Sequence, residues 1–305
     1  MRALLLPGKG WATTLQVFMR SILSLLGVCA VGSAMSAGLS MGMMGCTVAP
    51  SADGADAEVT SQTATAIVVV ERTTGPGDTV HADSVVARFV RVRLGTVDDQ
   101  ALRIAGVVQD LPAVGTCSAN AEASLAQKSR AVELLDVGPV SVADLQGHTT
   151  VLFPRTMPDP AGFVSGVFYS GRSNEAFAAG SNVEVHASGG ADLADGFVIS
   201  VPSPRELADV NVVSAPGGGL EITWDAGDPD AHDLVYVEML SPSGDLVASC
   251  AAEDAGTMSI PASALGAVDE GQLTLHRLHH ESFRVKGIDP GEVRFDLAHI
   301  LPFRR

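Results

Sequence analysis

Apolar and polar residues alternate at every second position in short runs along most of the chain, and this alternation limits the possible folds more than any other feature of the sequence. In "SVVARFVRVRLG", for example, Val90, Val92 and Leu94 alternate with Arg91 and Arg93. A period of two places successive side chains on opposite faces of a β-strand. Turn-forming Gly, Pro, Asn and Asp residues separate the runs. The sequence therefore predicts an all-β protein.

The strand-like runs that precede residue 205 predict a first β-rich domain, residues 63–205. These runs are "TATAIVVVERT", "SVVARFVRVRLG", "HTTVLFP", "FVSGVFYS", "NVEVHAS" and "GFVISVP". Residues 120–135, "NAEASLAQKSRAVELL", fit either a helix or a loop that runs into a strand at Val132. Pro202 and Pro204 in "VPSPREL" lack the N–H that a ladder needs and bias the preceding residues away from helix, so we place a domain boundary there.

Within "NVEVHAS" the alternation also predicts how single side chains face. Val183 and Val185 are expected on one side of the strand, and Glu184 and His186 on the other.

Seven further strand-like runs predict a second domain, residues 206–305, of the immunoglobulin-like β-sandwich type. The runs are "DVNVVSA", "GLEITWDA", "LVYVEML", "LVASCAA", "GTMSIP", "QLTLHRL" and "EVRFDLAHI". The segment from Asp209 to Phe303 resembles a fibronectin type III or related immunoglobulin-like domain. "LEITWDAGD" carries the resemblance, since Trp224 stands where that family packs its strand-B tryptophan, and "LVYVEM" matches the next strand. The resemblance implies that Trp224 is buried between sheets and that the domain serves in binding, spacing or display. With the first β-rich region, the expected fold is two β-sandwich-like domains.

The first 45 residues predict a secretory signal peptide. They contain the basic residues Arg2, Lys9 and Arg20, no acidic residue, and no charge at all over residues 21–45. Residues 46–62 are rich in Ala, Ser, Thr, Asp and Gly without apolar periodicity, which is typical of a flexible tether.

The end of this region, "MGMMGCTVAP", resembles the bacterial lipobox, in which a small residue precedes a lipidated cysteine. The resemblance implies a thioether-linked diacylglycerol on Cys46 and cleavage before it. The chain departs from the family pattern at Met43, where Leu is preferred, and at Met44, where a small residue is preferred. In Gram-negative lipoproteins an Asp after the cysteine signals retention at the inner membrane, and Thr47 here implies the outer membrane instead.

Two other interpretations of the N-terminal region remain open. Residues 21–45 are long enough to span a bilayer as an uncleaved anchor. An ordinary signal peptidase could instead cut near residues 34–37, which would leave Cys46 as a free thiol.

The charge of the exported chain limits its partners. The whole chain has a formal net charge of −16, and removing the three basic residues of the signal peptide makes it −19. Such a surface repels nucleic acid and anionic lipid headgroups. We therefore expect no nucleic-acid partner. The expected partners are the membrane, through the N-terminal lipid, and an unidentified protein or envelope polymer, and the sequence indicates no cofactor.

Two cysteines remain once Cys29 has left with the signal peptide and Cys46 has taken the lipid. Cys117 and Cys250 could form a disulfide in an oxidising compartment, and this bond would tie the two predicted domains together. They could equally be two buried free thiols, because Cys packs as a small hydrophobic residue.

Two clusters are candidates for metal binding, although neither has the complete ligand pattern of a metal site. The loop "WDAGDPDAHD" supplies carboxylates of the kind that calcium prefers, but it lacks the EF-hand pattern. It fits a solvated acidic turn equally well. The run "HRLHHES" could contribute to a zinc site, because on a strand His276 and His280 share a face and His279 points away. The weak metal candidates are Asp225, Asp228, Asp230, His276 and His280.

No motif for catalysis is present after the predicted signal peptide. Gly-x-Ser-x-Gly occurs only as "GLSMG" at residues 38–42, within that peptide, and no histidine lies next to Cys117 to mark it as a nucleophile. We expect a non-catalytic, lipid-anchored envelope protein with a binding or spacing role. The alternative is an exported hydrolase with its site at the domain interface, which His and carboxylate side chains converging from both halves would favour.

Overall fold

The computed structural model describes residues 64–77, 82–92, 102–103, 105–106, 108–118, 132–157, 164–173 and 175–305. The predicted signal peptide, Cys46, the predicted tether and most of residues 120–135 lie outside these ranges. Strands make up nearly all of the regular structure, so the all-β prediction is confirmed. None of the helices within the described ranges has the length and apolar character needed to cross a membrane.

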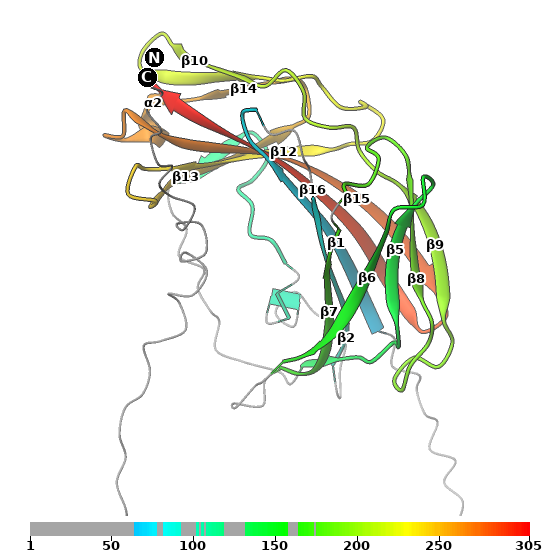
Figure 1. Ribbon diagram of the computed structural model, residues 1–305. Coiled ribbons are helices and arrows are strands. Elements are labelled where there is room, and N and C mark those ends of the chain that lie inside the picture. Colours follow the sequence, from blue (N-terminus) through cyan, green and yellow to red (C-terminus); the bar gives the residue numbers. More distant parts are fainter. Residues whose placement is uncertain are drawn as a thin grey trace, which may run out of the picture. The chain divides into compact units, whose positions relative to one another are not determined.

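The described residues form sixteen strands and the short helix α2, numbered in chain order, and Figure 1 labels most of them. Their bounds are β1 (Ala64–Thr74), β2 (Asp83–Val92), β3 (Thr116–Ser118), β4 (Val132–Leu134), β5 (Val140–Asp144), β6 (Thr149–Thr156), β7 (Val164–Arg172), β8 (Asn182–Ala187), β9 (Phe197–Pro202), β10 (Asn211–Ala215), β11 (Gly219–Thr223), β12 (Leu234–Leu240), β13 (Leu246–Glu253), β14 (Thr257–Ile260), α2 (Ala262–Leu265), β15 (Glu270–Val285) and β16 (Ile288–Arg304).

Thirteen of these strands form one long sheet, and the other three form a second, smaller sheet. The order in the long sheet is β3-β13-β12-β15-β16-β1-β2-β4-β7-β6-β5-β8-β9, and the order in the small sheet is β10-β11-β14. Neighbouring strands are antiparallel, apart from the parallel pairs β1–β16 and β4–β7. All thirteen strands expected from alternation are present, whereas β3 and β5 were not predicted and β4 was one of two alternatives. The strand at Val132–Leu134 confirms the loop-into-strand interpretation for those three residues.

The first hydrophobic core lies where the long sheet bends back on itself. Strands β1, β2 and β7 supply one side of this core, and β5, β8 and β9 supply the other. Val183 and Val185 are fully buried while Glu184 and His186 are exposed, which confirms the predicted facing of β8. The edge strand β9 approaches β15, with the rings of Phe197 and Phe283 5.8 Å apart.

The second core lies between the small sheet and the end of the long sheet formed by β12, β13, β15 and β16. This two-layer packing is β-sandwich-like, and all seven predicted strands of this region are present. Trp224 directly follows β11 and is 6% exposed, so its predicted burial is confirmed. Its indole Nε1 donates a hydrogen bond of 2.5 Å to Asp254.

The two long strands of the β15–β16 hairpin take part in both cores. Leu273, Leu275 and Phe303 pack in the second core, whereas Ile288 and Phe295 pack in the first. Figure 1 shows the hairpin running from the layer of β10 and β14 to the strands β8 and β9. The predicted boundary near residue 205 falls between β9 and β10, but the last two strands of the second region also complete the sheet of the first.

Candidate binding site

The β15–β16 hairpin carries polar side chains on both of its faces. His279 lies on the core side, where its Nδ1 is 2.6 Å from Asp233. His276 and His280 lie on the opposite face, each hydrogen-bonded to a carboxylate of β16 at 2.8 Å. This arrangement confirms the prediction that His276 and His280 share a face and that His279 points away. We call the face with His276 the strap face.

A segment that we call the strap, residues 105–118, crosses this face and is described except for residue 107. At its start, Arg88 of β2 donates a hydrogen bond of 3.0 Å to the carbonyl of Gly106. In its middle, Leu111 packs against Tyr236 and Leu278 of the strap face. At its end, the backbone N–H of Gly115 donates to Ala251 of β13 at 2.8 Å.

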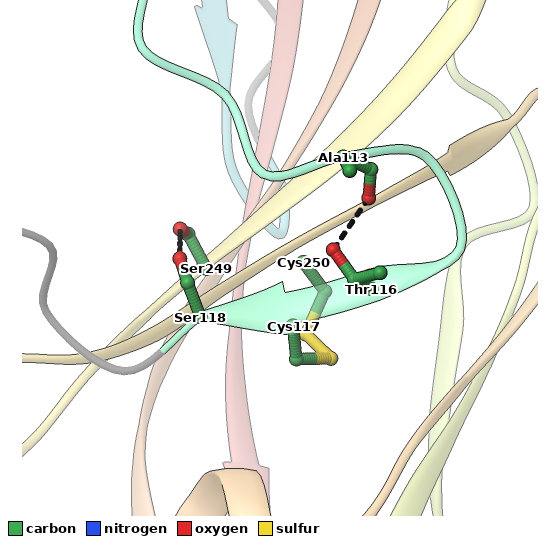
Figure 2. The surroundings of a disulfide bond; sticks show 6 residues. All are labelled: Ala113, Thr116, Cys117, Ser118, Ser249 and Cys250. Carbon is green, nitrogen blue, oxygen red and sulfur yellow. Dashed lines mark hydrogen bonds between the residues drawn. A yellow bond between two sulfur atoms is a disulfide. The ribbon is translucent and has the colours of Figure 1, made fainter.

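A disulfide bond between Cys117 and Cys250 closes the strap (Figure 2). Of the two alternatives that the sequence leaves open, the structure therefore contains the bonded one. The two cysteines are directly opposite in the β3–β13 ladder, so the strap ends as an edge strand of the long sheet. Next to the bond, the hydroxyls of Ser118 and Ser249 are 3.3 Å apart. Cys117 thus belongs to the same sheet as Cys250 rather than to a separate domain.

Two adjoining pockets lie between the strap and the sheet. The first has a volume of about 250 Å³, and strap residues Gly106, Val108 and Gln109 close one side of it. Its other lining residues come from three strands and are Val69, Glu71, Val86, Arg88, Arg294 and Asp296. The second pocket has a volume of about 380 Å³ and shares Val108, Gln109 and Arg294 with the first. The first pocket is therefore small, covered and lined by charges of both signs.

His276 and Asp296 form an oriented pair beside the first pocket. The Nδ1 atom of His276 is 2.8 Å from a carboxylate oxygen of Asp296. The ring of Tyr236 stacks on the imidazole with centroids 4.0 Å apart, and its hydroxyl donates to Asp296 at 3.4 Å. Burial raises the pKa of Tyr236, and the charge of Asp296 raises it further, so Tyr236 stays a neutral donor. The His276 Nε2 atom is buried and has no hydrogen-bond partner in the described part of the chain.

Glu71 brings a second carboxylate to the same place. It stands on β1 directly opposite Asp296 in the parallel β1–β16 ladder. Burial raises the pKa of Glu71, the charge of Asp296 raises it further, and Arg88 and His276 offset part of this effect. Glu71 is nevertheless exposed, so it lies at the mouth of the pocket. No hydrogen bond or ion pair joins Glu71 to another residue within the described ranges.

Arg88 lies on the neighbouring strand β2 and supplies a positive charge. Its guanidinium is 6.0 Å from the ring centroid of Phe168, and one of its Nη atoms donates a hydrogen bond to the Gly106 carbonyl. Burial lowers the pKa of Arg88, and the negative charge of Glu71 opposes this effect. The Nε atom of Arg88 is buried and lacks a hydrogen-bond partner among the described residues.

The other two charged side chains of the pocket are already paired. Arg294 donates to Glu292 at 2.8 Å, and Glu292 also bonds His280. These bonds lower the pKa of Glu292 in spite of its burial. The pocket therefore contains two satisfied charges, Asp296 and Arg294, and two that lack an ionic partner within the described ranges, Glu71 and Arg88.

On the core side, the polar side chains of β15 hold the two cores together. Arg277 is buried, bonds Asp254 at 2.6 Å, and donates to the carbonyls of Arg205, Glu206 and Asp225. These bonds fix the connection between β9 and β10 against the hairpin. The contacts are structural, because the groups are buried and mutually satisfied.

The residues of the candidate calcium loop do not converge on one point. The carboxylate of Asp233 is bonded to His279, and that of Asp228 accepts from the backbone of Asp230. Asp225 supplies its carbonyl, rather than its carboxylate, to Arg277. Across the ranges that the structure describes, no three His, Cys, Asp or Glu side chains are grouped as a metal site would require. His276 and His280 each have a carboxylate partner instead.

Sequence reasoning missed most of this site. Glu71 is followed by Arg72 at the end of the apolar run "AIVVVERT", and Arg88 is the only charge in "SVVARFV". These charges in apolar strands were the available signal. Their meeting with Asp296 depends on the pairing of β1 with β16, which are more than two hundred residues apart. No family model matches the chain, and no curated protein matches it either.

Proposed function

We propose that this protein is a non-catalytic, lipid-anchored protein of the bacterial envelope that binds a small polar ligand in the pocket under the strap. The observation that carries the binding role is a pocket of about 250 Å³ beside the strap, lined by the buried and unbonded Nε atom of Arg88 and by the exposed Glu71. Small ligand sites are concave, and a few polar groups in them fix the ligand. The Nε atom of Arg88 needs a partner, because leaving a polar atom buried and unbonded costs free energy.

The proposed lipid anchor and the proposed location at the outer membrane both rest on the N-terminal region. The charge pattern of residues 1–45, the cysteine at position 46 and the polar segment that follows support export, lipidation of Cys46 and display at the outer membrane. The C-terminal strands fit a fibronectin type III-like or immunoglobulin-like module, whose usual roles are binding and display. The disulfide suits an oxidising compartment outside the cytoplasm.

A second candidate function is an exported hydrolase. It is favoured because Glu71, from the first half of the chain, converges with His276 and Asp296 from the second half. The His276–Asp296 pair resembles the base of a hydrolase in that a carboxylate orients one ring nitrogen. However, no hydroxyl or thiol of the described residues is bonded to His276 Nε2, where a nucleophile would be held. The binding role therefore accounts better for the geometry.

Replacing Cys46 with Ser tests the anchor. The variant should lose labelling by radioactive palmitate and move from the membrane fraction to the soluble fraction, because each buried methylene contributes about 0.8 kcal/mol to membrane binding. Cys29→Ser serves as the control and should keep both the label and the membrane location. Unchanged membrane partitioning of the Cys46 variant would support an uncleaved anchor instead.

Filling the pocket tests the binding role. Thermal unfolding of the detergent-solubilised protein is measured with a panel of glucose, hexylammonium, hexanoate and 6-aminohexanoate, each in excess. At least one probe should raise the midpoint, since ligand binding stabilises the folded state. Val108→Trp, which fills the pocket from the strap, should abolish the shift, whereas Val114→Trp at an exposed strap position should retain it. The binding role is wrong if no probe shifts the midpoint.

Turnover of p-nitrophenyl acetate separates the two functions. The binding role predicts the same slow hydrolysis for the wild-type protein and for His276→Ala. A His276-dependent rate would favour the hydrolase.

A further inference from the structure

The charges around the pocket indicate what kind of ligand it takes. Of its four ionic side chains, Asp296 is bonded to His276, and Arg294 is bonded to Glu292. Glu71 and Arg88 have no ion pair with any residue that the structure describes. Glu71 and Arg88 act on each other only through their charges, so a ligand with one positive and one negative group would give each of them a direct partner.

Arg88 is suited to a carboxylate. Its guanidinium is held on one side by the Gly106 carbonyl and lies near the face of Phe168. This arrangement leaves the edge that contains Nε without a hydrogen-bond partner in the described part of the chain. A planar guanidinium edge binds a carboxylate through two parallel N–H···O bonds.

Glu71 is suited to an ammonium group. It stands opposite Asp296, so two carboxylates face one another across neighbouring strands. Their mutual repulsion is one cause of the raised pKa of Glu71. A cation placed between them would relieve this repulsion and favour the charged form of both groups.

The spacing of these two positions along the sheet favours a ligand whose two charges are separated. Arg88 is paired with Ile67 in the β1–β2 ladder, and Glu71 lies four residues farther along β1. At roughly 3.3 Å per residue, the two backbone positions are about 13 Å apart. The long Arg88 side chain shortens the gap between the charged groups, and a ligand with a spacer between its charges would span the remaining distance. The volume of about 250 Å³ also limits the ligand to a small molecule.

We propose that the pocket binds a small zwitterion with separated charges, such as a short peptide or an ω-amino acid, with its carboxylate on Arg88 and its ammonium between Glu71 and Asp296. This inference rests on the proposed binding function and adds the ligand class. The strap residues Val108 and Gln109 would cover the uncharged spacer, since they line both pockets.

Calorimetric titration of the detergent-solubilised protein with four probes tests the ligand class. The probes are 6-aminohexanoate, triglycine, hexanoate and hexylammonium. Either spaced zwitterion should bind at least about tenfold more tightly than the two probes with a single charge, because each charge-assisted contact contributes roughly that factor. Glycine, whose charges are adjacent, should bind as weakly as the single-charge probes.

Single-site variants with matched controls locate the two contacts. Arg88→Gln and Glu71→Gln should each reduce zwitterion affinity by about tenfold or more. Arg88→Lys should retain an intermediate affinity, because lysine keeps the positive charge but cannot make two parallel hydrogen bonds to a carboxylate. Lys286→Gln and Asp195→Asn remove one positive and one negative charge from an exposed ion pair elsewhere and should leave the affinity unchanged. Circular dichroism and the thermal midpoint establish that each variant is folded.

The outcomes distinguish this inference from the binding function itself. If hexanoate, hexylammonium or glucose binds as tightly as the zwitterions, or if either glutamine variant retains full zwitterion affinity, the ligand class is wrong while the pocket remains a binding site. If no probe binds at all, both proposals fail.

Discussion

At the scale of single residues, the charged and aromatic side chains of the hairpin region divide into a structural set and a candidate binding set. Trp224, Arg277 and His279 lie on the core side, are buried, and have hydrogen-bond partners. Glu71 and Arg88 lie on the strap face and have no ionic partner within the described ranges. Substitutions in the two sets should therefore affect different measurements, namely stability for the first set and ligand affinity for the second.

Trp224 is the clearest test of the structural set. Trp224→Ala should destabilise the protein by about 3–5 kcal/mol, because it leaves a large cavity in the second core. It also leaves Asp254 without the indole donor. Urea denaturation followed by circular dichroism measures the loss, and Trp224→Phe should lose less because most of the ring volume remains. A loss below about 1 kcal/mol for the alanine variant would contradict the buried position.

His279 makes the stability depend on pH. Burial disfavours its charged form, but the hydrogen bond and charge of Asp233 and the contact with Glu281 outweigh burial and raise the pKa of His279. A raised pKa in the folded state means that this stabilisation is complete below about pH 6.5, the unfolded value, and is lost as the pH rises through the folded value. The urea midpoint should therefore decrease as the pH is raised above about 6.5.

Two variants isolate the contribution of His279 to this decline. His279→Asn should remove the decline, because the group that titrates is gone. His280→Asn, on the exposed side of the same strand, should keep it. A wild-type midpoint that does not change over this range would show that His279 is not held in its charged form.

At the scale of elements, the strap joins distant parts of the long sheet. It begins next to β2, crosses β16, β15 and β12, and ends as the edge strand β3 against β13. Only three residues of β3 pair with the sheet, so its backbone hydrogen bonds are few. The disulfide is therefore the main bond that keeps the end of the strap in place.

The double variant Cys117→Ser/Cys250→Ser tests the contribution of this bond. The cysteines are separated by 133 residues, and the chain-entropy model predicts a loss of at most about 4–5 kcal/mol for a loop of that size. Urea denaturation measures the loss, and limited proteolysis should show faster cleavage within residues 105–118. Ser118→Ala/Ser249→Ala removes the neighbouring contact but keeps the disulfide, and it should behave like the wild type. Equal stability and equal cleavage of the cysteine variant would show that the strap is held by its other contacts.

At the scale of the whole described unit, the β15–β16 hairpin makes the two cores depend on each other. Each core contains residues from both strands, and Arg277 bonds the segment that connects β9 to β10. Unfolding either core would expose half of the hairpin and remove support from the other core. The two regions that sequence alternation separates at residue 205 should therefore unfold together.

Differential scanning calorimetry tests this coupling. We expect one transition, with the calorimetric enthalpy equal to the van't Hoff enthalpy, as in a two-state unfolding. Arg277→Ala should lower the midpoint of that single transition, since it leaves the buried Asp254 carboxylate unpaired. Two separate transitions in the wild-type protein would show that the regions behave as independent domains.

The sequence by itself determined those properties that depend on neighbours along the chain. Alternation predicted the all-β class, thirteen of the strands, the facing of Val183 and Val185, and the separation of His276 from His279, because side-chain direction in a strand follows from local position alone. The burial of Trp224 was predicted from the same alternation and from the resemblance of this segment to immunoglobulin-like domains.

The tertiary structure decided which of these strands lie side by side. The register between β1 and β16 brings Glu71 to Asp296, and the register between β3 and β13 joins Cys117 to Cys250. Alternation is the same for every possible partner strand, so it carries no information about pairing between segments far apart in the chain. For that reason the strap, the pocket and the shared hairpin, on which the proposed function depends, became visible only when the chain was folded.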